Sequence, residues 1–142
     1  MLEEINLFSS YYYLFDPDTQ RLFMQSCYTS LLCYEGFSRY EERMYNLLSN
    51  YIGDCYRHLR REEGDQWLLK LRLLPRNTSF LHQLIYAKIC EAFHLAAHGL
   101  AGEGRALAEE CAGIFRSLGF TAEADDTLRD FETILLSYQS IE

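Results

Sequence analysis

A run of apolar residues at steps of three and four is the feature that most constrains how this chain can fold. Its members are Tyr40, Met44, Leu47, Leu48, Tyr51, Cys55 and Leu59. At about 100° per residue, these positions share one face of an α-helix. That face is widened by Tyr45, Ile52 and Tyr56. The sequence therefore predicts a helix that several neighbouring helices contact.

Start and stop signals divide the chain into about seven helical segments. Expected starts are Asp16-Pro17, a capping box of Ser38 with Glu41, Asp65, one of residues 77–79, and Thr121. Expected stops are Gly36, Gly64, Pro75, Gly99 and Gly119. The helices would cover residues 2–15, 17–34, 38–63, 66–73, 79–98, 103–118 and 122–138.

The loops between these segments are short, about two to five residues, which makes sequential helices antiparallel neighbours. We find no linker or shift in composition that would divide the chain. The prediction is an all-α fold: a single domain over residues 1–142, built as a bundle of about six or seven antiparallel helices.

One segment, residues 102–136, shows a known pattern. Ala-Leu-Ala at 106–108 leads to Phe-Arg-Ser-Leu-Gly at 115–119 and then to Thr-Ala-Glu-Ala at 121–124. This quarter of the chain resembles the inter-helix region of tetratricopeptide repeats. The rest of the chain does not repeat it at a 34-residue period, and a stable array needs about three repeats. We therefore expect no repeat array.

Charge and cysteine content limit the compartment and the partners. The formal net charge of −8 opposes whole-surface binding to nucleic acid or to an anionic membrane. No apolar run approaches the roughly 20 residues that span a bilayer. The N-terminus opens with acidic residues, and the cysteines are odd in number, which suits reduced core thiols. We expect a cytoplasmic protein whose core contains Cys27, Cys33, Cys55, Cys90 and Cys111.

The charge is uneven along the chain. Residues 57–88 carry seven basic and three acidic side chains between two acidic flanks. The favoured interpretation is that these cations pair within the fold or face water. The alternative is an anion or nucleic-acid site beside Trp67. That site would need one exposed face to hold Arg57, Arg60, Arg61, Arg72 and Arg76.

The best metal-like spacing is Glu91-x-x-His94 with His98 four residues further on. Di-iron bundles use Glu-x-x-His, but they need a second copy and two more glutamates, which this chain lacks. A helical wheel places the three side chains opposite the core stripe of that segment, which contains Leu81, Ile85, Ile89, Ala92 and Ala96. We expect a solvated polar face, with no metal and no cofactor.

A second candidate site lies on the apolar side of the helix from residue 38. His58 shares the wheel angle of Tyr40 and Tyr51, so we expect it to be buried and hydrogen-bonded, with a tyrosine as a candidate partner. With Cys55 these residues would line a pocket between helices. No nucleophile, phosphate-loop or metalloprotease motif occurs, so we expect a protein that is not an enzyme.

The eleven tyrosines are many for a chain of 142 residues. Tyrosine is favoured in interfaces, and the candidates for an exposed patch are Tyr11, Tyr12, Tyr13, Tyr45 and Tyr56. The leading hypothesis is a non-enzymatic helical interaction module that works through a protein partner or its own dimer. The alternatives are a small-molecule binder or enzyme with a pocket near His58, and nucleic-acid or anion binding through residues 57–76.

Overall fold

The computed structural model describes residues 14–141, which contain six α-helices and no strand. The all-α prediction is therefore confirmed. The first expected helix lies almost wholly outside the described residues. A short 3₁₀ turn, Thr78–Phe80, directly precedes the helix that begins at Leu81. The helices are α2 (Pro17–Leu32), α3 (Tyr40–Arg57), α4 (Arg61–Arg72), α5 (Leu81–Ala97), α6 (Ala101–Ser117) and α7 (Thr121–Ser140).

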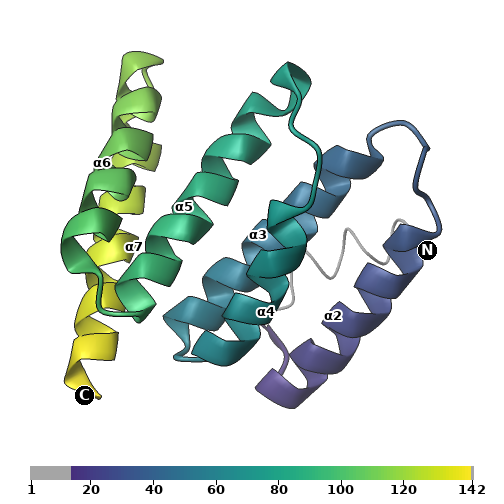
Figure 1. The fold of residues 1–142 in the computed structure, drawn as a ribbon, viewed down its shortest axis with the longest axis horizontal. Coiled ribbons are helices and arrows are strands. Elements are labelled where there is room, and N and C mark those ends of the chain that lie inside the picture. Colours follow the sequence, from purple (N-terminus) through teal and green to yellow (C-terminus); the bar gives the residue numbers. More distant parts are fainter. Residues whose placement is uncertain (1–13, 142) are drawn as a thin grey trace.

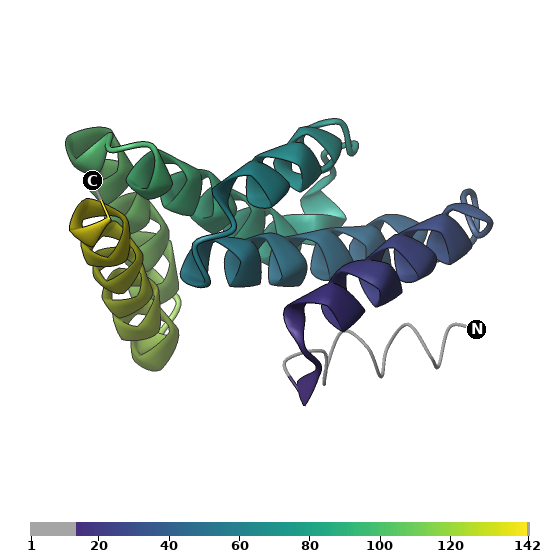
Figure 2. The ribbon, with the colours of Figure 1, turned by 90° about the horizontal axis from the view of Figure 1, so that it is seen from below.

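Successive helices lie side by side, with α2 at one end of the row and α6 and α7 at the other (Figure 1). Helices α3, α5 and α7 contact one another, while α4 packs against α3 and α5, and α6 packs against α5 and α7. Figure 2 shows the same row from below, with α2 lying along α3. None of the described helices is both long and apolar enough to cross a bilayer.

Helix α3 forms the centre of the core. The predicted stripe is buried from Tyr40 to Cys55, and Leu48, Ile52 and Tyr56 are fully enclosed. Four other helices, α2, α4, α5 and α7, contact it, which is what its wide apolar face predicts. The stripe ends before Leu59, which is 43% exposed because α3 stops at Arg57.

Two of the predicted helix starts form as expected. The Asp16 carboxylate accepts a hydrogen bond from the Thr19 amide at 3.0 Å, and Pro17 occupies the first turn of α2. Asn77 likewise accepts from the Ser79 amide at 2.9 Å. The capping box at Ser38 is wrong, because α3 begins after Arg39, whose φ of 65° places it in the left-handed region.

Three helix–helix joints share one backbone geometry. At each, an amide beyond the helix reaches the carbonyl five residues back: Arg60 to Cys55 at 2.8 Å, Leu100 to Leu95 at 2.9 Å, and Phe120 to Phe115 at 2.8 Å. The preceding residue has positive φ in each joint. These backbone hydrogen bonds close the helix C-termini, and the next helix starts without a side-chain cap.

Two of these joints use the predicted glycines, Gly99 and Gly119, whereas the third uses Leu59 at φ 61°. The predicted break at Gly64 is therefore wrong. The chain turns five residues earlier, and Gly64 and Asp65 lie within α4. The predicted cap at Thr121 is wrong as well. Phe120 occupies the N-cap position of α7, and Thr121 is the first residue of the helix.

Gly104 sets the approach of α6 to its neighbours. A Cβ atom there would lie 2.8 Å from the Phe131 ring and 3.2 Å from the Leu95 Cβ. Glycine therefore allows α6 to sit closely against both α5 and α7. Gly113, on the same helix, is exposed and has no atom within 4 Å of such a Cβ.

Substitution of Leu59 by glycine should stabilise the protein. A left-handed conformation costs a residue with a side chain roughly 1–2 kcal/mol, and glycine adopts it without that cost. We expect the free energy of unfolding, measured in urea, to rise by about 1 kcal/mol. A decrease would show that packing of the half-exposed Leu59 side chain outweighs its backbone strain.

The alanine variants of Gly104 and Gly113 should change stability in opposite directions. Alanine at an exposed helix interior gains about 1 kcal/mol over glycine, which we expect for Gly113→Ala. Gly104→Ala should instead lower the free energy of unfolding by about 1–3 kcal/mol, because its methyl group overpacks against Phe131. Thermal and urea unfolding of both variants measure the difference. Equal effects would contradict the close approach.

Candidate functional site

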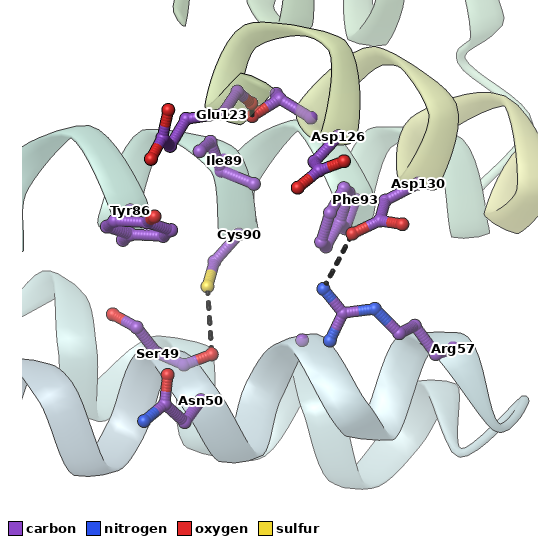
Figure 3. Close-up of a pocket in the computed structure, with 12 residues that line it drawn as sticks. Ser49, Asn50, Arg57, Tyr86, Ile89, Cys90, Phe93, Glu123, Asp126 and Asp130 are labelled. Carbon is purple, nitrogen blue, oxygen red and sulfur yellow. Dashed lines mark hydrogen bonds and ion pairs between the residues drawn. The ribbon is translucent and has the colours of Figure 1, made fainter. Parts of the chain in front are cut away.

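A cleft of about 390 Å³ lies between α3, α5 and α7 (Figure 3). Its volume falls within the range of ligand pockets. The three helices that contact one another in the row each contribute one wall. The lining residues are Ser49, Asn50, Gly53 and Arg57 from α3, Tyr86, Ile89, Cys90 and Phe93 from α5, and Glu123, Asp126, Thr127 and Asp130 from α7.

The α7 wall carries three carboxylates on one side of the helix. Glu123, Asp126 and Asp130 are spaced three and four residues apart, so they follow one another along a single face. Arg57 is the one cation among the lining residues. Asp126 also contacts Arg129 on its own helix, and both of these side chains are well exposed. The cleft therefore has an excess of negative charge.

One half of the cleft holds a guanidinium group supplied by the protein itself. The Arg57 guanidinium lies 5.4 Å from the centre of the Phe93 ring and 3.1 Å from the Asp130 carboxylate. A Cβ on Gly53 would come within 3.1 Å of the Arg57 Nη1 atom. Glycine at this position leaves room for the arginine to extend along α3 toward α7, as Figure 3 shows.

The other half of the cleft contains similar groups without a cation. Tyr86 is 37% exposed, and its pKa is raised by burial and then by the nearby charges of Glu123 and Asp126. Among the described residues, Glu123 forms no ion pair. The α3 wall on this side includes a polar group as well. The buried Ser49 hydroxyl has no hydrogen-bond partner among the described residues. This half thus offers a partly exposed aromatic ring, the Glu123 carboxylate, and the Asp126 carboxylate that contacts Arg129.

The pocket expected around His58 is arranged differently. Tyr51 and Cys55 are buried in the core, and the Tyr51 hydroxyl donates a hydrogen bond to Glu63. Tyr40 is also buried, at 7% exposure. The expected burial of His58 is wrong: its side chain is 62% exposed, and its Nδ1 lies 2.9 Å from the Asp54 carbonyl oxygen. The helix ends at Arg57, so the wheel angle no longer applies.

The five arginines of the candidate anion patch have separate surroundings. Arg57 pairs with Asp130, as described, and Arg60 pairs with the buried Asp54 at 2.9 Å. Arg61 donates to the Ala97 carbonyl oxygen at 3.2 Å. The remaining two lie further along the chain, Arg72 in a two-pronged pair with Glu91 at 2.7 and 2.8 Å and Arg76 exposed beyond α4.

Two of the five tyrosines proposed for an exposed interface are buried. Tyr45 and Tyr56 are 2% and 0% exposed, so this expectation is wrong for both. Their rings fill the core, and their hydroxyls find partners at its edge. Tyr45 donates to the Pro75 carbonyl oxygen at 3.0 Å, and Tyr56 donates to Asp65 at 2.7 Å. Residues 11–13 lie outside the described residues.

The three residues with metal-like spacing separate into two groups. Glu91 is engaged by Arg72, while His94 and His98 both turn toward Asp65 on α4. Asp65 was missed as a site residue because it precedes His94 by 29 positions. No local pattern in the sequence links the two.

Comparisons of the chain with protein-family models, with curated proteins and with solved structures give no match. Function is therefore inferred from the geometry of the cleft and of the polar groups around it.

Alkylation should distinguish the cysteine at the surface from those in the core. Burial raises the pKa of Cys90 to about 12 and that of Cys111 to about 11, and it also raises the pKa of Cys55. Cys33 is exposed. Because the thiolate is the reactive form, we expect iodoacetamide to modify Cys33 alone in the folded protein.

Mass spectrometry of the labelled peptides checks this pattern, with urea-unfolded protein as the control in which all thiols react. Rapid modification of Cys55 in the folded protein would contradict its burial. It would also favour a reactive pocket beside Tyr51.

Proposed function

We propose that this protein is an interaction module that binds a basic, arginine-containing segment of a partner protein in the cleft between α3, α5 and α7. The observation that carries the proposal is the contrast between the two halves of the cleft. Arg57 lies between Phe93 and Asp130 in one half, whereas no lining residue supplies a cation to Tyr86 and Glu123 in the other, and Asp126 there contacts Arg129, which lies outside the lining. The cleft thus already holds one guanidinium and offers similar surroundings for a second.

Guanidinium suits these surroundings better than ammonium. Its plane stacks on aromatic rings and its paired N–H groups match a carboxylate, while Lys acts as a more strongly hydrated point charge. Tyr86 supplies a partly exposed ring, and Glu123 supplies a carboxylate without an ion pair among the described residues. We therefore expect the module to prefer arginine to lysine.

The spacing of the carboxylates fits an extended segment. Asp126 and Asp130 are four residues apart on α7, a rise of about 6 Å. An extended chain advances about 3.3 Å per residue and places every second side chain on the same side. A partner with basic residues at alternate positions would thus match the α7 wall. The net charge of −8 adds a long-range attraction for such a segment.

The other functions considered from the sequence have less support. The arginines of residues 57–76 are largely engaged by carboxylates and a carbonyl of this chain, which leaves little for a phosphate backbone. The proposal assigns no catalytic step to the cleft. We still expect a cytoplasmic protein with reduced cysteines. Gel filtration at two concentrations would measure whether the protein also forms a dimer.

Binding of a labelled peptide tests the proposal. The probe is a fluorescein-labelled, terminally blocked peptide Gly-Arg-Gly-Arg-Gly, followed by fluorescence anisotropy. We expect binding to weaken with salt, and the double variant Glu123→Gln/Asp126→Asn to lower affinity about 3- to 10-fold, as the loss of two partly exposed charge contacts implies. The matched control is Glu103→Gln/Glu109→Gln, which removes the same charge from exposed positions on α6.

Three outcomes would contradict the proposal. They are no binding of the peptide, equal binding by both double variants, or equal binding of a second peptide in which lysine replaces both arginines. Equal loss in both variants would show that only net charge matters.

A further inference from the structure

A second polar cluster lies where α4 packs against the last turn of α5. His94 Nδ1 is 2.9 Å from one oxygen of Asp65, and His98 Nε2 is 2.8 Å from the other. The two imidazole rings lie with their centres 4.5 Å apart. The three side chains are between 25% and 36% exposed, so the cluster is open to ions from solvent.

The three side chains offer a donor set typical of transition-metal sites. One nitrogen from each histidine and one carboxylate oxygen all lie within 4.8 Å of one another. Two histidines with one carboxylate is a recurrent ligand set for zinc and for other divalent first-row metals. Neighbouring donors around a tetrahedral zinc ion with bonds of about 2.1 Å lie about 3.4 Å apart. The two histidine–carboxylate distances are shorter, at 2.9 and 2.8 Å, and involve different oxygens of Asp65, so the side chains would move slightly apart to admit the ion.

The carboxylate is held in place by a buried group. The Tyr56 hydroxyl, on a fully buried side chain of α3, donates to Asp65 at 2.7 Å. Gly64 makes this contact possible, because a Cβ there would lie 2.9 Å from the Tyr56 ring. Hydrogen bonds of this kind orient metal-binding carboxylates and strengthen metal sites. The adjacent Glu91 is not a fourth ligand, since Arg72 engages both of its oxygens.

We propose that Asp65, His94 and His98 bind one divalent transition-metal ion, with Zn²⁺ as the expected ion, and that the ion joins α4 to α5. Each imidazole then carries its proton on the nitrogen that does not contact the metal. The remaining coordination positions face solvent. The inference does not depend on the peptide-binding cleft, whose lining residues are different.

Metal titration tests the proposal on the full chain. Protein stripped with a chelator is titrated with Zn²⁺ by calorimetry and with Co²⁺ by visible absorption. We expect one ion per chain, Co²⁺ absorption bands typical of nitrogen and oxygen ligands, and a higher melting temperature with Zn²⁺. The variants Asp65→Asn, His94→Gln and His98→Gln should each lower affinity at least about tenfold, and Tyr56→Phe should lower it less.

Two controls separate this site from casual binding to surface histidines. His58→Gln removes an exposed histidine beside a different carboxylate, and Glu91→Gln removes the neighbouring carboxylate on α5. Both should bind Zn²⁺ as the unmodified protein does. Circular dichroism establishes that each variant is folded. If Asp65→Asn unfolds, the more exposed His98→Gln carries the test.

The proposal is overturned if the unmodified protein binds no ion, or if folded Asp65→Asn binds as tightly as the unmodified protein. The second result would mean that the histidine pair alone picks up metal from solution.

Discussion

The burial of α3 on nearly all sides is the constraint on which the rest of this structure depends. An amphipathic helix with a narrow stripe needs one partner, but the wide face of α3 must be covered by α2, α4, α5 and α7. That requirement brings α5 and α7 to the same side of α3. The cleft lies between these three helices, each of which also contributes buried residues to the core.

The same constraint explains how the tyrosines and arginines are used. Tyr45, Tyr51 and Tyr56 place their rings in the core and their hydroxyls at its edge, where each finds an acceptor. Asp54 is buried with them, and Arg60 pairs with it, because a buried charge without a partner is costly. These three tyrosines and Arg60 therefore serve the interior, while the lining of the open cleft has more carboxylates than cations.

Helix α5 carries both candidate sites on adjacent faces. Tyr86 and Phe93 face the cleft toward α7, while His94 and His98 face α4. One helix can serve two sites because neighbouring residues differ by about 100° in direction. Packing against α3, α4, α6 and α7 holds it in place, and of the residues in the two sites only His98, the C-cap residue of α5, lies outside a helix.

What the sequence determined by itself is local. The helical period of the α3 stripe, the Asp16-Pro17 start and the glycines at 99 and 119 depend on interactions within a few residues, and all agree with the structure. The turn at Leu59 was not predicted, because a leucine gives no sign of a left-handed conformation. The wheel angle of His58 failed with it.

Tertiary structure alone decided which distant residues meet. Glu123 and Asp130 read as ordinary surface acids until α7 packs beside α3 and α5, and Asp65 reads as a helix cap until α4 places it against His94 and His98. The physical reason is that helix formation is governed by near neighbours, whereas these sites are formed by packing between helices. The wide stripe on α3 demands that packing without specifying which side chains it brings together.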